Sequence, residues 1–423
     1  MFDIALDFLT NQSAASLIGV FWMPLFIELP RYFLGGVILA WFVLFRRDPV
    51  RTRAVYDGGI SVVVAGHNNA AGIRQTVLSL REQSLGPLQI IVVDDGSTDG
   101  TEHTFRALER SGLIDEHIRL RSRGGKSAAV NAALDRARYP LFLVTDADTT
   151  FDRTALAVAA SYFIDPAVAA VGGTLRVRNL DASLATWVQH VNYAFTITLG
   201  RIVKDVLGFY FVASGAFGVY RTDAVRSIGG WDFGPGEDGD IMARLRIAGW
   251  KARFAPFAVA MTDVPETFPV LGRQRLRWNR SMVRLRFRKA RDHVINPMRA
   301  NFDLPLALSF WDIYYFRGVV PFIFTIYLVH LFYLYGSFAL VLMLVITAFY
   351  SIAAIVKYLL VLSVSTRPKE DFKYVVCAPL YGLANVYFLR FVRLYAVVNE
   401  LIFRGSYTDV YVPAKVRNQA ERF

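Results

Sequence analysis

Two short acidic motifs contain the residue types needed to hold a divalent cation and to accept a proton. Asp146 and Asp148 follow the apolar run LFLVT, and Glu237 and Asp238 precede the segment IMARLRIAG. Two carboxylates at positions i and i+2 of an extended segment can bind Mg²⁺ or Mn²⁺, whose coordination is often completed by substrate phosphates. A carboxylate at a helix start can act as a general base, or it can simply complement the helix dipole. Each motif is weak alone, so their combination has to carry the interpretation.

Two further motifs have the composition of a nucleotide site. Asp94 and Asp95 follow the apolar run QIIVV. Their carboxylates can accept hydrogen bonds from a base or a ribose, or can form an Asx-type turn with Thr98 capping the next helix. Lys126 follows a Gly-Gly pair at a predicted helix start, which suits phosphate oxygens. The spacing around Lys126 is not that of a P-loop, so that class of phosphate site is excluded.

A basic and aromatic motif, R-Q-R-L-R-W, occupies positions 273–278 and contains Arg275. On a helix, Gln274, Arg277 and Trp278 would share one face. A guanidinium can fork onto phosphate oxygens, and an indole offers a flat face to a sugar ring. Positions 273–291 include nine Lys or Arg residues and no acidic residue, so the segment also fits an amphipathic helix on anionic headgroups.

The elements that must position these motifs follow from the alternating pattern of residues 58–260. Strands are predicted at 60–65, 88–93, 117–121 and 141–145. Helices are predicted at 72–83, 98–110 and 126–138. This alternation predicts a mostly parallel, Rossmann-like α/β sheet with crossover helices. Ligands bind such sheets at the carboxyl ends of the strands, where the acidic motifs fall.

The composition points to a membrane protein. The 423 residues are 54% hydrophobic and 14% aromatic, with a net charge of +12. Most of the excess cations flank apolar segments, which fits the positive-inside bias of membrane proteins better than a nucleic-acid binder. The single cysteine, Cys377, excludes an intrachain disulfide framework and a cysteine-based metal site.

Several apolar segments are long enough to interact with a bilayer. Residues 17–45 are broken at 28–31, and we favour one crossing with a kink at Pro30 over an interfacial helix followed by a crossing. Arg46, Arg47, Arg51 and Arg53 then place the following domain in the cytoplasm. Residues 318–335 and 338–362 are each long enough to cross.

Two other segments are harder to assign. Residues 374–403 either cross or form an interfacial or re-entrant segment, which would keep the basic tail inside. Arg390 and Arg393 either line a polymer path or, as we favour, snorkel at the interface. Residues 184–206 are predicted to form an interfacial helix between the α/β domain and the bilayer.

The order of the motifs resembles one family. D-D-G-S, G-G-K-S-A-A-V-N, D-A-D, S-G-A-F-G-V-Y-R, G-E-D and Q-R-L-R-W succeed one another along the chain. This succession is similar to the membrane-integrated, processive family 2 glycosyltransferases, the group of cellulose, chitin, hyaluronan and poly-N-acetylglucosamine synthases. The resemblance covers residues 58–300 by motif. It departs from the family at the first strand, where Asn69 replaces the usual glutamate.

The resemblance implies a GT-A-type catalytic domain embedded between transmembrane helices, with a role for each motif. Asp94 and Asp95 would contact the uridine, and Lys126 the nucleotide-sugar. Asp148, supported by Asp146, would bind Mg²⁺ or Mn²⁺. Asp238 would be the base, with Glu237 beside it. Gln274, Arg275, Arg277 and Trp278 would form the acceptor and diphosphate site.

The implied activity is inverting, processive transfer of a hexose from UDP-glucose or UDP-N-acetylglucosamine to a growing β-linked polysaccharide, with translocation across a bacterial inner membrane. Secretion or regulatory subunits are possible partners, and nucleic acid is not expected. Transfer of one sugar to a lipid phosphate, or a catalytically silent nucleotide-binding subunit, are the alternatives. The expected domains are an N-terminal membrane segment (1–50), a cytoplasmic catalytic domain (55–265), amphipathic interface helices (266–303), a C-terminal membrane region (304–403) and a cytoplasmic tail (404–423).

Overall fold

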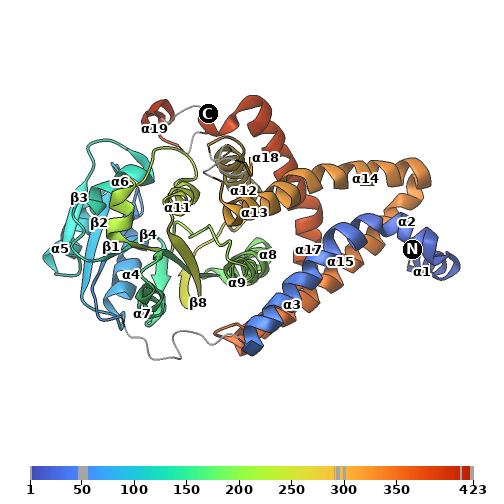
Figure 1. Ribbon diagram of the computed structural model, residues 1–423, viewed down its shortest axis with the longest axis horizontal. Helices are drawn as coiled ribbons and strands as arrows, with labels where there is room; N and C mark the ends of the chain where they lie inside the picture. Colours follow the sequence, from blue (N-terminus) through green and yellow to red (C-terminus); the bar gives the residue numbers. More distant parts are fainter. Residues whose placement is uncertain are drawn as a thin grey trace.

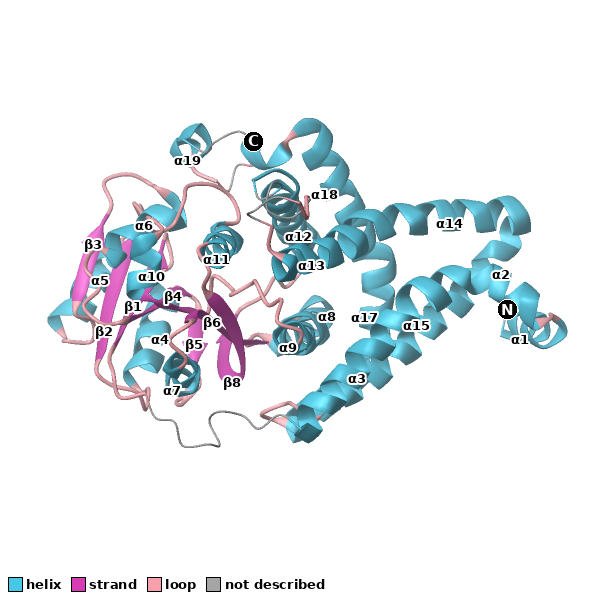
Figure 2. Cartoon of the chain, in the orientation of Figure 1, coloured by secondary structure: helices cyan, strands magenta, loops and turns pink. Residues whose placement is uncertain are grey.

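The computed structural model describes residues 2–45, 56–289, 291, 296–298, 302–409 and 412–419. The cations predicted to follow the first membrane segment, Arg46, Arg47, Arg51 and Arg53, lie outside the described residues. An α/β domain occupies one side of the molecule, and long helices extend from it on the other side (Figure 1). Figure 2 shows the strands gathered in the α/β domain alone.

The centre of the α/β domain is an eight-stranded sheet in the order β3-β2-β1-β4-β7-β6-β8-β5. The strands are β1 (Ile60–Gly66), β2 (Leu88–Asp94), β3 (Glu116–Arg119), β4 (Leu141–Asp146), β5 (Thr149–Phe151), β6 (Val168–Val177), β7 (Gly218–Arg221) and β8 (Lys251–Thr262). β1 is parallel to β2 and β4, β2 to β3, and β6 to β8, whereas β7 runs antiparallel between β4 and β6. The predicted parallel core is therefore confirmed.

Crossover helices cover both faces of the sheet, which explains why its central strands are continuous apolar runs. They include α4 (Ala70–Arg81), α5 (Thr101–Arg110), α6 (Gly125–Leu134), α7 (Ala155–Ala160) and α11 (Glu237–Ile247). The alternative in which Thr98 caps the next helix was wrong in that one point. Gly100, in the left-handed region at φ +82°, precedes α5, and the carboxylate of Asp99 accepts the N–H of Thr101 at 3.1 Å. The helix therefore starts three residues later than expected.

Two helical segments connect the α/β domain to the long helices. The first is α8 (Leu184–Tyr193), η5 (Ala194–Leu199) and α9 (Gly200–Val206), which confirms the helix predicted at 184–206. It packs against α3 (Leu29–Phe45), α15 (Ala339–Leu362) and α17 (Ala378–Leu383). The second is α12 (Phe268–Val283) with η6 (Arg284–Lys289), and it packs against α18 (Arg390–Phe403). The basic motif therefore lies at the boundary between the two parts.

The N-terminal membrane segment is one helical stretch from Ala14 to Phe45, long and apolar enough to cross a bilayer. It consists of α2 (Ala14–Trp22), the π-helical turn η1 (Met23–Glu28) and α3. The backbone departs from helical angles at Phe21 (φ −103°, ψ 19°), ahead of Pro24, and the π-helical turn η1 precedes Pro30. A proline clashes with the preceding turn and removes one backbone donor, so both prolines follow a distorted stretch, and the kink lies nearer to Pro24 than to the predicted Pro30.

The C-terminal third contains two further apolar stretches of sufficient length, Leu304–Leu362 and Pro368–Phe403. The first comprises α13 (Leu304–Ile313), η8 (Tyr314–Val319), α14 (Val320–Tyr335), η9 (Gly336–Phe338) and α15, so both helices predicted at 318–335 and 338–362 are present. The second contacts the catalytic half near both its ends, through Asp371 with Arg176 and through Glu400 with Arg288 at 3.1 Å.

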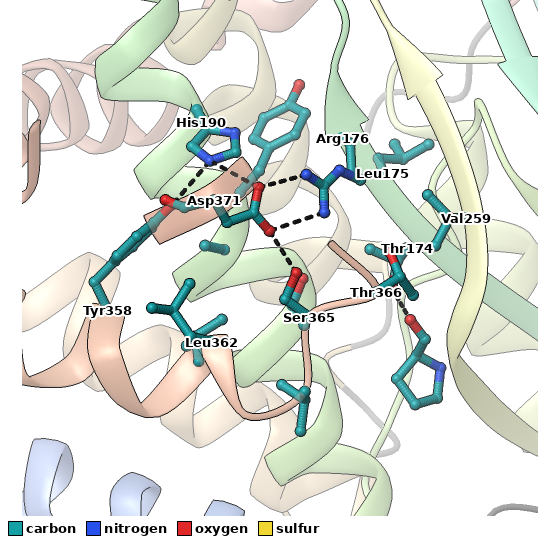
Figure 3. Close-up of a pocket in the computed structure, with 16 residues that line it drawn as sticks. Thr174, Leu175, Arg176, His190, Val259, Tyr358, Leu362, Ser365, Thr366 and Asp371 are labelled. Atoms are coloured by element: carbon teal, nitrogen blue, oxygen red, sulfur yellow. Dashed lines mark hydrogen bonds and ion pairs between the residues drawn. The ribbon is translucent and has the colours of Figure 1, made fainter. Parts of the chain in front are cut away.

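A buried polar network fixes the start of that segment to the sheet (Figure 3). Asp371 accepts from Arg176 of β6 at 2.9 Å and lies 3.7 Å from Nε2 of His190 on α8. His190 also contacts the hydroxyl of Tyr358 at 2.9 Å. Burial lowers the pKa of His190 to about 4, so this imidazole is neutral at pH 7. The network joins β6, α8 and α15 to α16 (Pro368–Phe372), which carries Asp371.

Candidate active site

The sheet register brings two of the acidic motifs to one edge. β1 lies between β2 and β4, with Gly66 opposite Asp94 and Ala65 opposite Asp146. The carboxyl ends of three parallel strands therefore meet there, as expected for the ligand edge of an α/β sheet.

Asp94 and Asp95 shape the loops of this edge. Asp94 is fully buried, and its Oδ1 accepts the N–H of Ser97 at 2.8 Å, which is an Asx-type turn. Asp95 accepts the N–H groups of Gly124 at 2.6 Å and Gly125 at 2.9 Å. The two residues thus hold the D-D-G-S loop against the G-G-K loop. Oδ2 of Asp94 is buried with no hydrogen-bond partner among the described residues.

The departure at the first strand has a clear structural role. Asn69 is the N-cap of α4, and its side chain accepts the N–H of Gly72 at 3.2 Å. Asn68, at φ +52°, accepts the N–H of Thr98 at 2.9 Å, and Nδ1 of His67 lies 3.0 Å from the carbonyl of Asp95. The replacement of glutamate by Asn69 therefore leaves the loop tied to the D-D-G-S segment.

Lys126 joins three motifs. Its ammonium forms an ion pair with Asp146 and donates to the carbonyl of Gly215 at 2.8 Å. Burial alone would lower the pKa of Lys126, but the charges of Asp146 and Glu237 outweigh it and raise the pKa. Arg201 supports the same loop, donating to the hydroxyl of Ser214 at 2.6 Å. Arg201 was missed from the sequence, because nothing local distinguishes it from an interfacial cation.

Asp146 and Asp148 fit a divalent cation that is shared with a phosphate. Burial and the charge of Asp146 raise the pKa of Asp148. The hydrogen bonds that Asp148 accepts from the hydroxyls of Thr149 and Thr262 are long, at 3.3 Å and 3.4 Å. No cluster of three or more His, Cys, Asp or Glu suited to a metal occurs in the described chain. The protein would therefore supply two ligands, a common arrangement for Mg²⁺ on a nucleotide.

Glu237 and Asp238 open α11 after Gly236, which has φ +84°. Burial and the charge of Asp238 raise the pKa of Glu237 to about 7, although Lys126 opposes this. The charges of both carboxylates act on Lys126, and the charge of Asp238 also acts on Arg286 of η6.

The basic motif lies on α12 as predicted, and a guanidinium of the motif stacks on the indole. The guanidinium of Arg275 lies 4.2 Å from the ring centroid of Trp278 and 5.8 Å from that of Tyr193 on α8. We expected Arg277 to share a face with Trp278. Arg275 also does so, because it lies three positions before Trp278 and side chains at i and i+3 meet on a helix. Nε and Nη2 of Arg275 and Oε1 of Gln274 are buried without hydrogen-bond partners among the described residues. Trp278 is 44% exposed, so its ring is available to a ligand.

The C-terminal tail also reaches the site, which the sequence did not indicate. Val416 of α19 (Ala414–Gln419) is buried against the G-G-K loop, and a Cβ atom at Gly125 would lie 3.1 Å from it. Tyr407 accepts from Arg284 of η6 at 3.1 Å. Figure 1 shows α19 beside α6. No signal in residues 404–423 distinguishes this role from that of a solvated basic tail.

Comparison with known proteins agrees with this geometry. The family model described as "Glycosyltransferase like family 2" matches residues 58–281. Poly-beta-1,6-N-acetyl-D-glucosamine synthase of Staphylococcus aureus (strain COL) is 30% identical over 223 residues, covering 52% of this chain and 53% of that protein. The protein of the same name from Staphylococcus epidermidis is 27% identical over 261 residues, covering 60% and 62%. The chain thus spans about half the length of the curated relatives it matches.

One solved structure shows the same fold. It is a mannosyltransferase from Pyrobaculum calidifontis in complex with GDP-Man and Mn²⁺, with a TM-score of 0.61, 21% identity, and coverage of 88% of this chain and 97% of that one. The fold is therefore of the GT-A type, with apolar helices flanking the catalytic domain. Enzymes of this fold generally use a divalent metal.

Proposed function

The chain belongs to glycosyltransferase family 2, and we propose that it polymerises a UDP-activated hexose into a β-linked polysaccharide by an inverting, processive reaction. One observation carries the proposal. The paired carboxylates Asp146 and Asp148, the Lys126 ammonium and the Glu237–Asp238 pair converge at one sheet edge, beside an arginine–tryptophan stack on a helix that packs against a membrane segment.

The donor side is formed by the loops at the ends of β2 and β4. The nucleotide would lie over the D-D-G-S loop that Asp94 and Asp95 shape, with its diphosphate near Lys126. Asp148 and Asp146 would hold a Mg²⁺ or Mn²⁺ ion, which neutralises charge on the leaving diphosphate. Lys126 adds positive charge at the same place. Arg277 is the candidate for a further contact with phosphate oxygens, whereas Arg275 stacks on Trp278.

The acceptor side is formed by α11 and α12. Asp238 would take the proton of the acceptor hydroxyl, which attacks the anomeric carbon as UDP leaves. A single displacement inverts the anomeric centre, so an α-linked donor gives a β-linkage. The exposed ring of Trp278 would stack on the acceptor sugar, and Gln274 would donate or accept a hydrogen bond there.

Processive synthesis and translocation are supported by three apolar helical stretches next to the site. The names of the relatives favour UDP-N-acetylglucosamine over UDP-glucose as the donor. We place the catalytic domain on the cytoplasmic side of a bacterial plasma membrane, because cations follow the first apolar segment in the sequence. Secretion or regulatory subunits remain candidate partners.

The proposal is tested with the full chain in lipid nanodiscs, supplied separately with UDP-N-acetylglucosamine and UDP-glucose. UDP release and product size are followed together. We expect a high-molecular-weight product from UDP-N-acetylglucosamine, abolished by EDTA and restored by Mg²⁺ or Mn²⁺. A product carrying one sugar on a lipid would contradict polymerisation, and UDP binding without transfer from any donor would contradict catalysis.

A further inference from the structure

Charged side chains gather where the interface helix α9, the segment after α12 and two membrane helices come together. Asp312 of α13 accepts from Arg31 of α3 at 2.9 Å and from Lys204 of α9 at 3.2 Å. Arg286 of η6 and Arg317 of η8 are close enough for their charges to act on Lys204. We call Arg31, Lys204, Arg286 and Arg317 the cationic cluster. Asp312 thus bonds to two of the four cations, and the charge of Asp238 also acts on Arg286.

The positive charge of the cationic cluster is poorly compensated. Nε of Arg286 is buried without a hydrogen-bond partner, and its guanidinium lies 5.3 Å from the ring of Phe310. Neither Arg286 nor Arg317 forms an ion pair with a residue in the described ranges. A buried donor without a partner is costly, and an anion bonded to Arg286 would remove that cost.

The directions of the pKa shifts within the cationic cluster agree with its poorly compensated positive charge. Burial lowers the pKa of Lys204 to about 8, with Asp312 opposing and the other three cations adding to the decrease. Burial and the charge of Arg317 likewise lower the pKa of Arg286 to about 10. Each cation therefore destabilises the charge of its neighbours, as in a phosphate site that has no phosphate bound.

The surroundings indicate a lipid as the source of the anion. Arg31 and Arg317 belong to apolar helical stretches that are long enough to cross a bilayer. Three large aromatic side chains on the same stretch as Arg317 are exposed: Trp311, Tyr314 and Tyr315. Exposed aromatic residues of this kind typically mark the headgroup level of a bilayer. Arg317 itself is exposed, so a headgroup can reach the cluster.

We propose that the cationic cluster binds the phosphate of a membrane lipid, with the arginine forks of Arg286 and Arg317 on its oxygens. Asp238 is among the charges that act on Arg286, so the bound phosphate would lie on the acceptor side of the candidate site. The inference rests on the proposed function in one respect: the acceptor side, next to which the lipid phosphate would bind, is the one defined there.

The test uses the full chain in detergent and three probes: a short polyprenyl monophosphate, phosphatidylglycerol and inorganic phosphate, with phosphatidylcholine as the zwitterionic reference. Native mass spectrometry measures lipid binding, and the Tm reports stabilisation. The variant is Arg286→Gln/Arg317→Gln. Its matched control is Lys369→Gln, which removes an exposed cation on α16.

We expect both phosphate lipids, or the polyprenyl phosphate alone, to bind the wild type in preference to phosphatidylcholine. Loss of two charge-assisted contacts should weaken this binding at least about tenfold in the double variant and not in Lys369→Gln. The Tm of the lipid-free double variant should stay the same or rise, because uncompensated charge has been removed, and its affinity for UDP should be unchanged.

Three results would overturn the proposal. They are equal binding of phosphatidylcholine and the phosphate lipids, binding of inorganic phosphate with no binding of either lipid, and a fall in UDP affinity that parallels the loss of lipid binding. The last would assign the cluster to the donor diphosphate. The measurement needs no sugar donor, so an absence of sugar transfer would contradict the proposed function without affecting this result.

Discussion

At the scale of single residues, two neighbouring carboxylates, Glu237 and Asp238, are the candidates for the base. The charges of both act on Lys126, which is paired with Asp146, and the charge of Asp238 also acts on Arg286 of η6. We propose Asp238 as the base, because a base must lie next to the hydroxyl it deprotonates and Arg286 lies towards the proposed acceptor side.

The assignment predicts a separation of binding from turnover. Asp238→Asn should lower kcat by about 100-fold or more, the usual contribution of a general base, while UDP binds with unchanged affinity. Glu237→Gln should weaken donor binding, because Lys126 loses a neighbouring charge. Asp223→Asn, which changes an exposed acidic residue on α10 (Thr222–Ser227), is the control. Turnover retained in Asp238→Asn would remove Asp238 from this role.

At the scale of elements, α12 and the G-G-K loop connect the site to its surroundings. α12 carries Arg275 and Trp278 as a stacked pair facing Tyr193, and it also packs on α18. The loop before α6 is covered by the C-terminal tail through Gly125 and Val416. Both elements therefore link ligand contacts to segments that lie far away in the sequence.

The stack on α12 predicts an effect on the acceptor. Arg275→Ala should release the ring of Trp278 and raise the KM for an oligosaccharide acceptor about tenfold, a loss comparable to one strong cation–π contact. The affinity for UDP should change less. Arg273→Ala, an exposed cation on the same helix, is the matched control. Equal effects of the two variants on the acceptor KM would contradict a specific role for the stack.

The covered loop predicts a difference between two glycines with similar backbones. Gly125 and Gly112 have φ +79° and +71°, but only Gly125 has neighbours within 4 Å of an added Cβ. Gly112→Ala should cost about 1 kcal/mol of stability through backbone strain alone. Gly125→Ala should in addition displace Val416 and lower activity strongly, as measured by UDP release. Similar activities of the two variants would show that the tail contact is dispensable.

At the scale of the whole molecule, much of the fold was predictable, because it follows from local patterns. The parallel strands and their acidic ends were found within one or two residues, since buried apolar runs punctuated by glycine and aspartate are strong local signals. Contacts between distant segments could not be found in this way. The expected snorkelling of Arg390 was wrong, because that side chain is buried and pairs with Glu28 at 2.7 Å, 362 positions away.

The junction between β6, α8 and the membrane segment predicts a pH-dependent stability. The pKa of His190 is about 4 when folded and 6.5 when unfolded, so the unfolded chain binds more protons between these values. Stability should therefore fall as the pH decreases from 6.5 to 4, by up to about 3 kcal/mol. Thermal unfolding should be measured at several pH values. The fall in stability between pH 6.5 and 4 should be smaller in His190→Gln than in the wild type, and the same as in the wild type in the exposed His103→Gln. An identical pH dependence in His190→Gln would contradict a buried neutral imidazole.

The most direct test of the central claim is the product length at early times, with the purified chain in nanodiscs, a large excess of UDP-N-acetylglucosamine and Mg²⁺ or Mn²⁺. A processive synthase that keeps its acceptor on Trp278 and in the membrane part should give long chains while most of the donor is still unconsumed. The account predicts that early products are already of high molecular weight and that Asp238→Asn gives none. Early products of one or two sugars that lengthen only as the donor is consumed would contradict it.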